Sequence, residues 1–297
     1  MSDARNNNTQ SSPPSLIPDL PDSKTYSSLS DIYFDVITNK TFLIALAVGA
    51  LGFFLLQKFG ETVHSKLVRG SRRSKVSKQL LGTYFQSLFH AIGMSVCSYL
   101  VIFKFVDHPE SLETVDRADD AYFYVVLYKA CTVLSMSYFL MLTPYELFGI
   151  EQSMNFRVTM FVHHLAGILC QAIVLVSNPV FIVVGAMTLQ CEASTIFLNM
   201  RMFGLTMENK YLYFIGGVGA LITYPLTRIV FYWYNIQKTY ALMDTFIDHV
   251  GVNAFYLTIS SQVFVLCMSI GYTVLLWKSP RKMVFLKTDK LKIKKQQ

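Results

Sequence analysis

Two adjacent histidines, His163 and His164, lie inside a long apolar run of the sequence, and Glu192 lies inside the next one. Ionisable side chains at membrane depth are rare because removing them from water is costly. An imidazole can act as a general base, carry an acyl group transiently or bind a metal. The same side chains can instead form a hydrogen-bond network that holds helices together. The residue types leave the catalytic and structural roles open. They disfavour a metal, because two helical ligands normally stand four residues apart.

The elements that must position these side chains are membrane-spanning helices. The chain is 53% hydrophobic and only 15% charged, whereas soluble domains carry roughly 25% charged residues. Long apolar runs of this kind predict an all-α, polytopic membrane protein with about seven spans. We expect the spans at residues 41–59, 81–105, 121–142, 156–176, 179–203, 211–234 and 252–277.

The basic residues predict how the chain sits in the membrane. They gather in a loop at 60–80 and in a tail at 283–297, and both segments should therefore be cytosolic. Seven spans then place the polar arm at 1–40 on the luminal side. We expect this arm to be disordered, with a short interfacial piece at 33–37.

Two short motifs bear on processing and location. Asn7 begins a glycosylation sequon, which can be used only if the arm is luminal. Lys294 and Lys295 stand fourth and third from the end of the chain and resemble the dilysine signal read by coat machinery. That resemblance implies retrieval to the endoplasmic reticulum. The alternative is a basic tail held near anionic lipid.

Helix geometry places four ionisable groups at one depth. At 1.5 Å per residue, His163 and His164 lie ~12 Å from the cytosolic end of their span, and His90 lies ~14 Å from the same side. Glu192 lies ~20 Å from the luminal end of the next span. Adjacent residues on a helix are ~100° apart. One histidine can therefore face a cavity while the other bonds a neighbouring helix.

Further polar residues belong to the same predicted cavity. Asn199 follows Glu192 on one helix face, and Ser194 lies on another. Arg228 follows Pro225 in the luminal half of its expected span. A buried arginine requires an anion, which could be Glu192 or a lipid phosphate, or else a backbone carbonyl as hydrogen-bond acceptor. We therefore predict one polar set whose members face one another or a shared cavity: His90, Glu192, Ser194, Asn199 and Arg228. No nucleotide- or metal-binding motif is found, and we expect no cofactor and no metal.

The stretch Cys-Glu-Ala-Ser-Thr-Ile-Phe-Leu-Asn-Met-Arg at 191–201, taken with the histidine pair, resembles the TLC domain of the TRAM, Lag1 and CLN8 proteins. Ser87 and His90 fit the same pattern. The resemblance covers roughly residues 76–282, implies a six-helix bundle, and is strongest to the transmembrane protein 56 group of TLC domain-containing proteins.

The resemblance implies a function in handling lipid. The known enzymes of the family are ceramide synthases, whose motif has a later histidine and two aspartates. Here Cys191, Glu192 and Thr195 occupy those three places. We therefore expect a protein of the endoplasmic reticulum that binds a membrane lipid and contributes to lipid homeostasis, without ceramide synthase activity. One alternative is a lipid N- or O-acyltransferase that uses acyl-coenzyme A and His163 or His164. Another is a membrane-protein chaperone or trafficking adaptor.

Overall fold

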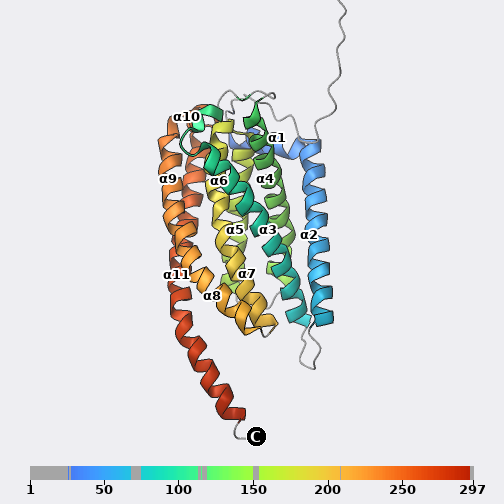
Figure 1. Ribbon diagram of the computed structural model, residues 1–297. Helices are drawn as coiled ribbons and strands as arrows, with labels where there is room; N and C mark the ends of the chain where they lie inside the picture. The colour runs from blue at the N-terminus through green and yellow to red at the C-terminus, as the bar shows by residue number, and fades with distance from the viewer. Residues whose placement is uncertain are drawn as a thin grey trace, which may run out of the picture.

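The computed structural model describes residues 26, 28–67, 75–112, 115, 119–149, 154–207 and 209–294. Within these ranges the chain is helical, contains no strand, and forms an elongated bundle (Figure 1). Seven of the described helices are long and apolar enough to cross a membrane, at residues 40–65, 79–105, 120–144, 157–176, 179–206, 210–241 and 252–278. The predicted polytopic helical fold is confirmed.

Most spans are single helices, but two are interrupted. A 3₁₀ turn divides the fifth span, and a π-helical segment divides the sixth. In chain order the elements are α1 (Leu29–Thr38), α2 (Lys40–Leu67), α3 (Lys75–Phe105), η1 (Pro109–Leu112), α4 (Asp120–Pro144), η2 (Tyr145–Gly149), α5 (Met154–Val176), η3 (Pro179–Phe181), α6 (Ile182–Leu189), η4 (Gln190–Glu192), α7 (Ala193–Thr206), α8 (Lys210–Pro225), η5 (Leu226–Val230), α9 (Phe231–Ala241), α10 (Met243–Val250) and α11 (Val252–Lys294).

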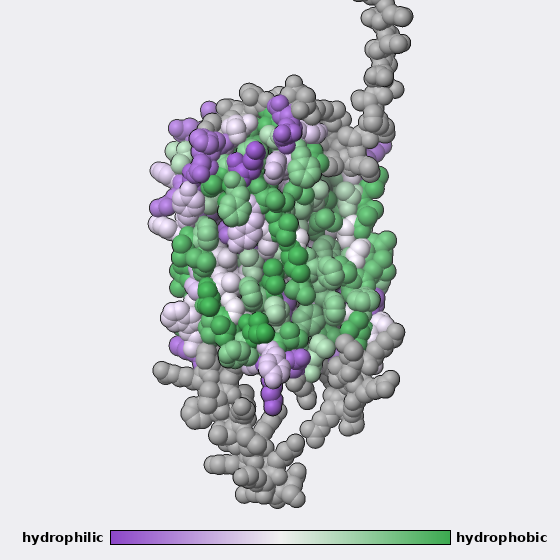
Figure 2. Space-filling model, in the orientation of Figure 1, coloured by the Kyte–Doolittle hydropathy of each residue, from purple (hydrophilic) through white to green (hydrophobic). Residues whose placement is uncertain are grey.

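The two ends of the bundle are distinct. At the lower end of Figure 1, α2 ends and α3 begins, and α11 extends past the bundle. We call this the α2–α3 end. The opposite end, which we call the α10 end, carries α1 and α10. Figure 2 shows an apolar belt between polar residues at the two ends, which is the surface that a lipid bilayer requires.

The first helix is longer than the interfacial piece predicted at 33–37. It starts after Ser28, whose Oγ accepts a hydrogen bond from the backbone N of Asp31 at 3.3 Å, an ordinary N-terminal cap. Ile32 and Val36, four residues apart, are buried in the main core. Helix α1 is therefore packed against the bundle. Residues 1–25 of the predicted arm, including Asn7, lie outside the described residues, as does Lys295. Lys294 is the last residue of α11.

The fifth span lies at the centre of the bundle. Its apolar window is the most buried of the seven candidate spans, and it continues through α7 into a tight hairpin with α8. Glycine permits this approach, because a Cβ atom at Gly216 would collide with the backbone of Arg201. Glu192 thus lies on the element that the other spans surround.

Candidate functional site

Glu192 is the meeting point of the polar residues. It ends the 3₁₀ turn η4, and 11% of its side chain is exposed. One carboxylate oxygen, Oε1, lies 3.5 Å from Arg228 Nη2, and the other, Oε2, lies 3.8 Å from His90 Nδ1. The Cys191 thiol donates to Oε1 at 3.7 Å. Groups from α3, η4 and η5 therefore converge on one carboxylate.

Arg228 reaches Glu192 from a locally widened helix. Pro225 cannot donate a backbone hydrogen bond, and the chain after it forms the π-helical segment η5, in which Phe231 N donates to Leu226 O five residues earlier. Arg228 Nε donates to Ser194 Oγ at 3.0 Å, and Nη2 donates to Thr195 Oγ1 at 2.9 Å. The guanidinium is thus fixed against the start of α7.

The position of Arg228 is closer to the middle of its span than the sequence predicts. The span was expected to end at residue 234, which placed Arg228 in its luminal half. In the structure the span runs from Lys210 to Ala241, so Arg228 lies near its middle. The guanidinium lies at the depth of Glu192, whose carboxylate is its anion.

His90 is held on its far side by a buried relay. Its Nε2 lies 2.9 Å from Ser135 Oγ, and Gln171 Nε2 donates to the same oxygen at 2.9 Å. Because Ser135 accepts from Gln171, its hydroxyl is free to donate to His90 Nε2, which leaves the Nδ1 proton facing Glu192. The ring also stacks on Tyr138, with centroids 4.0 Å apart. His90 is only 2% exposed, so this relay is part of the protein interior.

The histidine pair is divided between two roles. His164 Nδ1 lies 3.2 Å from Thr143 Oγ1, which itself donates to Phe139 O at 2.7 Å, so the threonine accepts from the histidine. The His164 ring stacks on Phe139 at 4.9 Å. His163 differs, because its Nδ1 has no hydrogen-bond partner among the described residues. One histidine is therefore tied to α4 and the other is not.

A large cavity of about 590 Å³ lies between the spans and the polar residues. Its lining begins near the α2–α3 end, at Leu80, Met202 and Leu275, and reaches Glu192 and Arg228 near mid-span. Asn199 lies on its wall and donates to Ser87 Oγ at 2.9 Å. Ligand sites for small molecules occupy roughly 300–1,000 Å³. The cavity is therefore large enough for a lipid.

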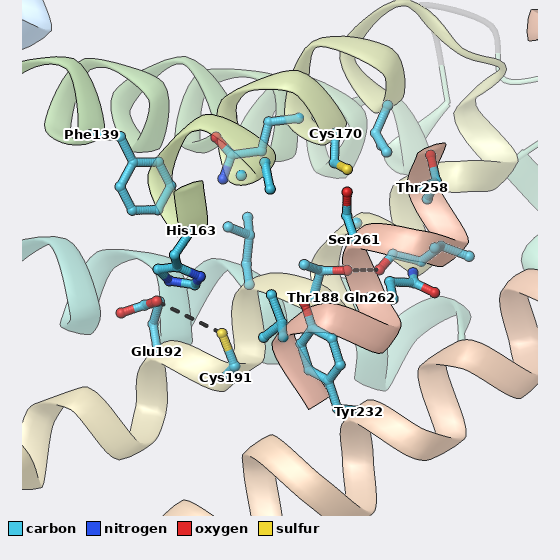
Figure 3. Close-up of a pocket in the computed structure, with 18 of the residues that line it drawn as sticks. Phe139, His163, Cys170, Thr188, Cys191, Glu192, Tyr232, Thr258, Ser261 and Gln262 are labelled. Atoms are coloured by element: carbon cyan, nitrogen blue, oxygen red, sulfur yellow. Dashed lines mark hydrogen bonds between the residues drawn. The ribbon is translucent and has the colours of Figure 1, made fainter. Parts of the chain in front are cut away.

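A smaller chamber of about 60 Å³ continues beyond the histidines. Figure 3 shows His163, Glu192 and Cys191 at one side of this chamber, and Thr258, Ser261 and Gln262 at the other. His163 and Glu192 line both spaces, whereas Arg228 lines only the large cavity. We call His163, Glu192 and Arg228 the polar shelf, because the first two line both spaces and Arg228 is paired with Glu192.

The structure joins four members of the predicted polar set, because His90, Ser194 and Arg228 cluster with Glu192. Asn199 instead contacts Ser87, and neither His90 nor Ser194 lines the large cavity. Sequence reasoning missed the partners of the histidines. Ser135, Gln171 and Thr143 complete the contacts of His90 and His164. Their signal was present, since each is a polar residue inside an apolar span. Across the described ranges, no group of three or more His, Cys, Asp or Glu side chains could hold a metal ion.

Comparison with known proteins gives one match. The family model of the TLC domain matches residues 82–278, more than half of the chain. This range includes α4 to α10 and nearly all of the residues that line the two spaces. No curated protein matches the chain, and no solved structure matches it.

Proposed function

The chain belongs to the TLC domain family, and from that premise we propose that it binds one lipid molecule in the large cavity. The main support for this proposal is that the cavity of about 590 Å³ ends on the polar shelf. Apolar and aromatic walls such as Leu198, Met268 and Tyr272 suit hydrocarbon. The shelf offers a place for the lipid's polar group, which would otherwise be unsatisfied at that depth.

We further propose that the protein contributes to lipid homeostasis in the endoplasmic reticulum and belongs with the transmembrane protein 56 group. Basic segments next to the α2–α3 end support a cytosolic mouth for the cavity. Replacing Lys294 and Lys295 together by serine should release the protein to later compartments, as judged by fluorescence microscopy. Unchanged location would argue against retrieval through this tail.

We propose no ceramide synthase activity. Cys191 and Thr195 stand where the synthase motif has ionisable groups, and both are committed to the ion pair here. The Cys191 thiol donates to Glu192, and the Thr195 hydroxyl accepts from Arg228. These contacts support a binding site in which Glu192 is paired with Arg228 and is not a free acid or base.

A pair of tryptophan variants tests lipid binding. Leu198 lines the cavity, while Leu205, on the same helix, is 59% exposed at the outer surface. Leu198→Trp should lower the amount of lipid that copurifies, measured by mass spectrometry of extracts, because indole fills the cavity. Leu205→Trp should retain lipid at the wild-type level. Equal lipid content in the two variants would contradict binding in the cavity.

A second candidate function is lipid acylation, favoured by His163, which lines the cavity and whose Nδ1 has no hydrogen-bond partner among the described residues. In this reaction His163 removes the proton from a lipid alcohol or amine as its oxygen or nitrogen attacks the acyl-coenzyme A thioester. The carbon–sulfur bond breaks, and coenzyme A leaves as the thiol after receiving that proton. Labelled acyl-coenzyme A, offered with several acceptors, should give product with His164→Ala but not with His163→Ala. Absence of any acylated product from the wild type would exclude this activity.

A further inference from the structure

We propose that the Glu192–Arg228 pair makes the site selective for lipids whose polar group is uncharged, most simply lipid alcohols. This inference rests on the proposed lipid binding and specifies its substrate class. It follows from charge balance on the polar shelf, and from which hydrogen-bonding atoms the pair leaves free.

The first step is charge. Arg228 and Glu192 lie 3.5 Å apart, each with 11% of its side chain exposed, and both line the large cavity. One full positive and one full negative charge therefore compensate each other at the cavity's inner end. Two histidines, His163 and His164, also line the cavity, and His164 is hydrogen-bonded to Thr143. Within the described residues, no second carboxylate, lysine or arginine lines this cavity.

The second step is hydrogen bonding. Arg228 uses Nε and Nη2 on Ser194, Thr195 and Glu192, which leaves Nη1 as a donor without a partner among the described residues. Glu192 Oε2 is 3.8 Å from His90 Nδ1, beyond ordinary hydrogen-bond length. The Glu192–Arg228 pair therefore retains one donor and one acceptor. A hydroxyl group can accept from the guanidinium and donate to the carboxylate at the same time.

The third step is the penalty for a charged head. A carboxylate or phosphate placed against Arg228 would also lie near Glu192, and an ammonium placed against Glu192 would lie near Arg228. Either ligand leaves one uncompensated charge beside two largely buried side chains, which is strongly unfavourable. An alcohol adds no charge and uses both free atoms.

Three ligands with the same chain and different heads test the inference: octadecanol, stearate and octadecylamine at neutral pH. Each competes for the purified protein against a photoactivatable lipid alcohol in nanodiscs. The wild type should bind octadecanol at least about tenfold more tightly than either charged ligand, a difference of about 1.4 kcal/mol. Glu192→Gln should shift the ranking about tenfold or more towards stearate, and Arg228→Gln should shift it towards octadecylamine.

The double variant Glu192→Gln/Arg228→Gln is the matched control, because it removes both charges and should restore the preference for octadecanol. A wild type that binds stearate or octadecylamine as well as octadecanol would overturn the inference while lipid binding stands. Single variants that fold, shown by thermal unfolding, but keep the wild-type ranking would also overturn it. Where a single variant fails to fold, the rankings of the wild type and the double variant decide alone. If none of the three ligands binds and no lipid copurifies, the proposed function itself is rejected.

Discussion

His90 and His163 lie at similar depth in neighbouring parts of one polar cluster, yet their surroundings differ. His90 is almost fully buried, stacks on Tyr138 and is hydrogen-bonded to Ser135. His163 lines both the large cavity and the small chamber, and its Nδ1 has no hydrogen-bond partner among the described residues. The surroundings of His90 thus link α3, α4 and α5, whereas His163 borders the cavity and the chamber.

The difference teaches that neither residue type nor membrane depth decides the role of a buried histidine. In both rings Nδ1 has no hydrogen-bond partner among the described residues. What separates the two regions is that Ser135 and Tyr138 hold the rest of the His90 ring, whereas His163 lines the large cavity and the chamber. An imidazole held by protein groups contributes to helix packing, and removing it leaves those groups unpaired. An imidazole that lines a cavity is available to a ligand. Each prediction below should affect one region more than the other.

The largest expected loss of stability comes from His90→Ala. The substitution opens a void beside Tyr138 and leaves the Ser135 hydroxyl proton without its acceptor, which together should lower the free energy of unfolding by about 2–4 kcal/mol. Thermal unfolding of the purified protein in detergent measures the change. Wild-type stability combined with loss of bound lipid would reverse the roles assigned to the two regions.

A smaller loss should follow from Ser135→Ala. The hydroxyl links His90 to Gln171, so its removal leaves two buried groups unsatisfied at a cost of about 1–3 kcal/mol. Ser98→Ala on α3 is the matched control, because Ser98 is equally buried and donates only to Met94 O on its own helix. The same unfolding assay should show little change for the control. Equal losses would mean that the relay adds nothing specific.

The smallest change in stability should come from His163→Ala, below about 1 kcal/mol, because no hydrogen bond is broken. Its effect should instead be on ligand, with less lipid alcohol retained after purification than in the wild type. Mass spectrometry of lipid extracts and thermal unfolding of the same sample measure the two effects together. A loss of stability as large as that of His90→Ala would show that His163 is also structural.

Much of this architecture could be predicted from the sequence, because apolar runs and basic flanks report spans and their order directly. The common depth of His90, the histidine pair and Glu192 also follows from helix rise. The ion pair between Glu192 and Arg228 does not follow from the sequence, which leaves several partners open for Arg228. It depends on where the sixth span ends and on the π-helical segment after Pro225, and no apolar pattern encodes either feature.

The hydrogen-bond partners of the histidines could not be predicted for a different reason. Ser135 and Gln171 are recognisable as polar residues in apolar spans, but only packing shows that they meet at His90. The division of labour between His163 and His164 likewise depends on Thr143, a residue from another helix. Sequence spacing indicates that adjacent histidines must diverge, and the tertiary structure decides which one is satisfied.

The central claim is that a lipid occupies the large cavity with its polar group at the shelf, and photo-crosslinking tests it most directly. A long-chain alcohol with a diazirine on its chain is irradiated with the protein in nanodiscs, and labelled peptides are sequenced. The account predicts labels on cavity residues such as Leu198, Met268 and Tyr272, which excess octadecanol removes. Labels confined to outward-facing residues such as Leu51 and Phe103, unaffected by octadecanol, would contradict it.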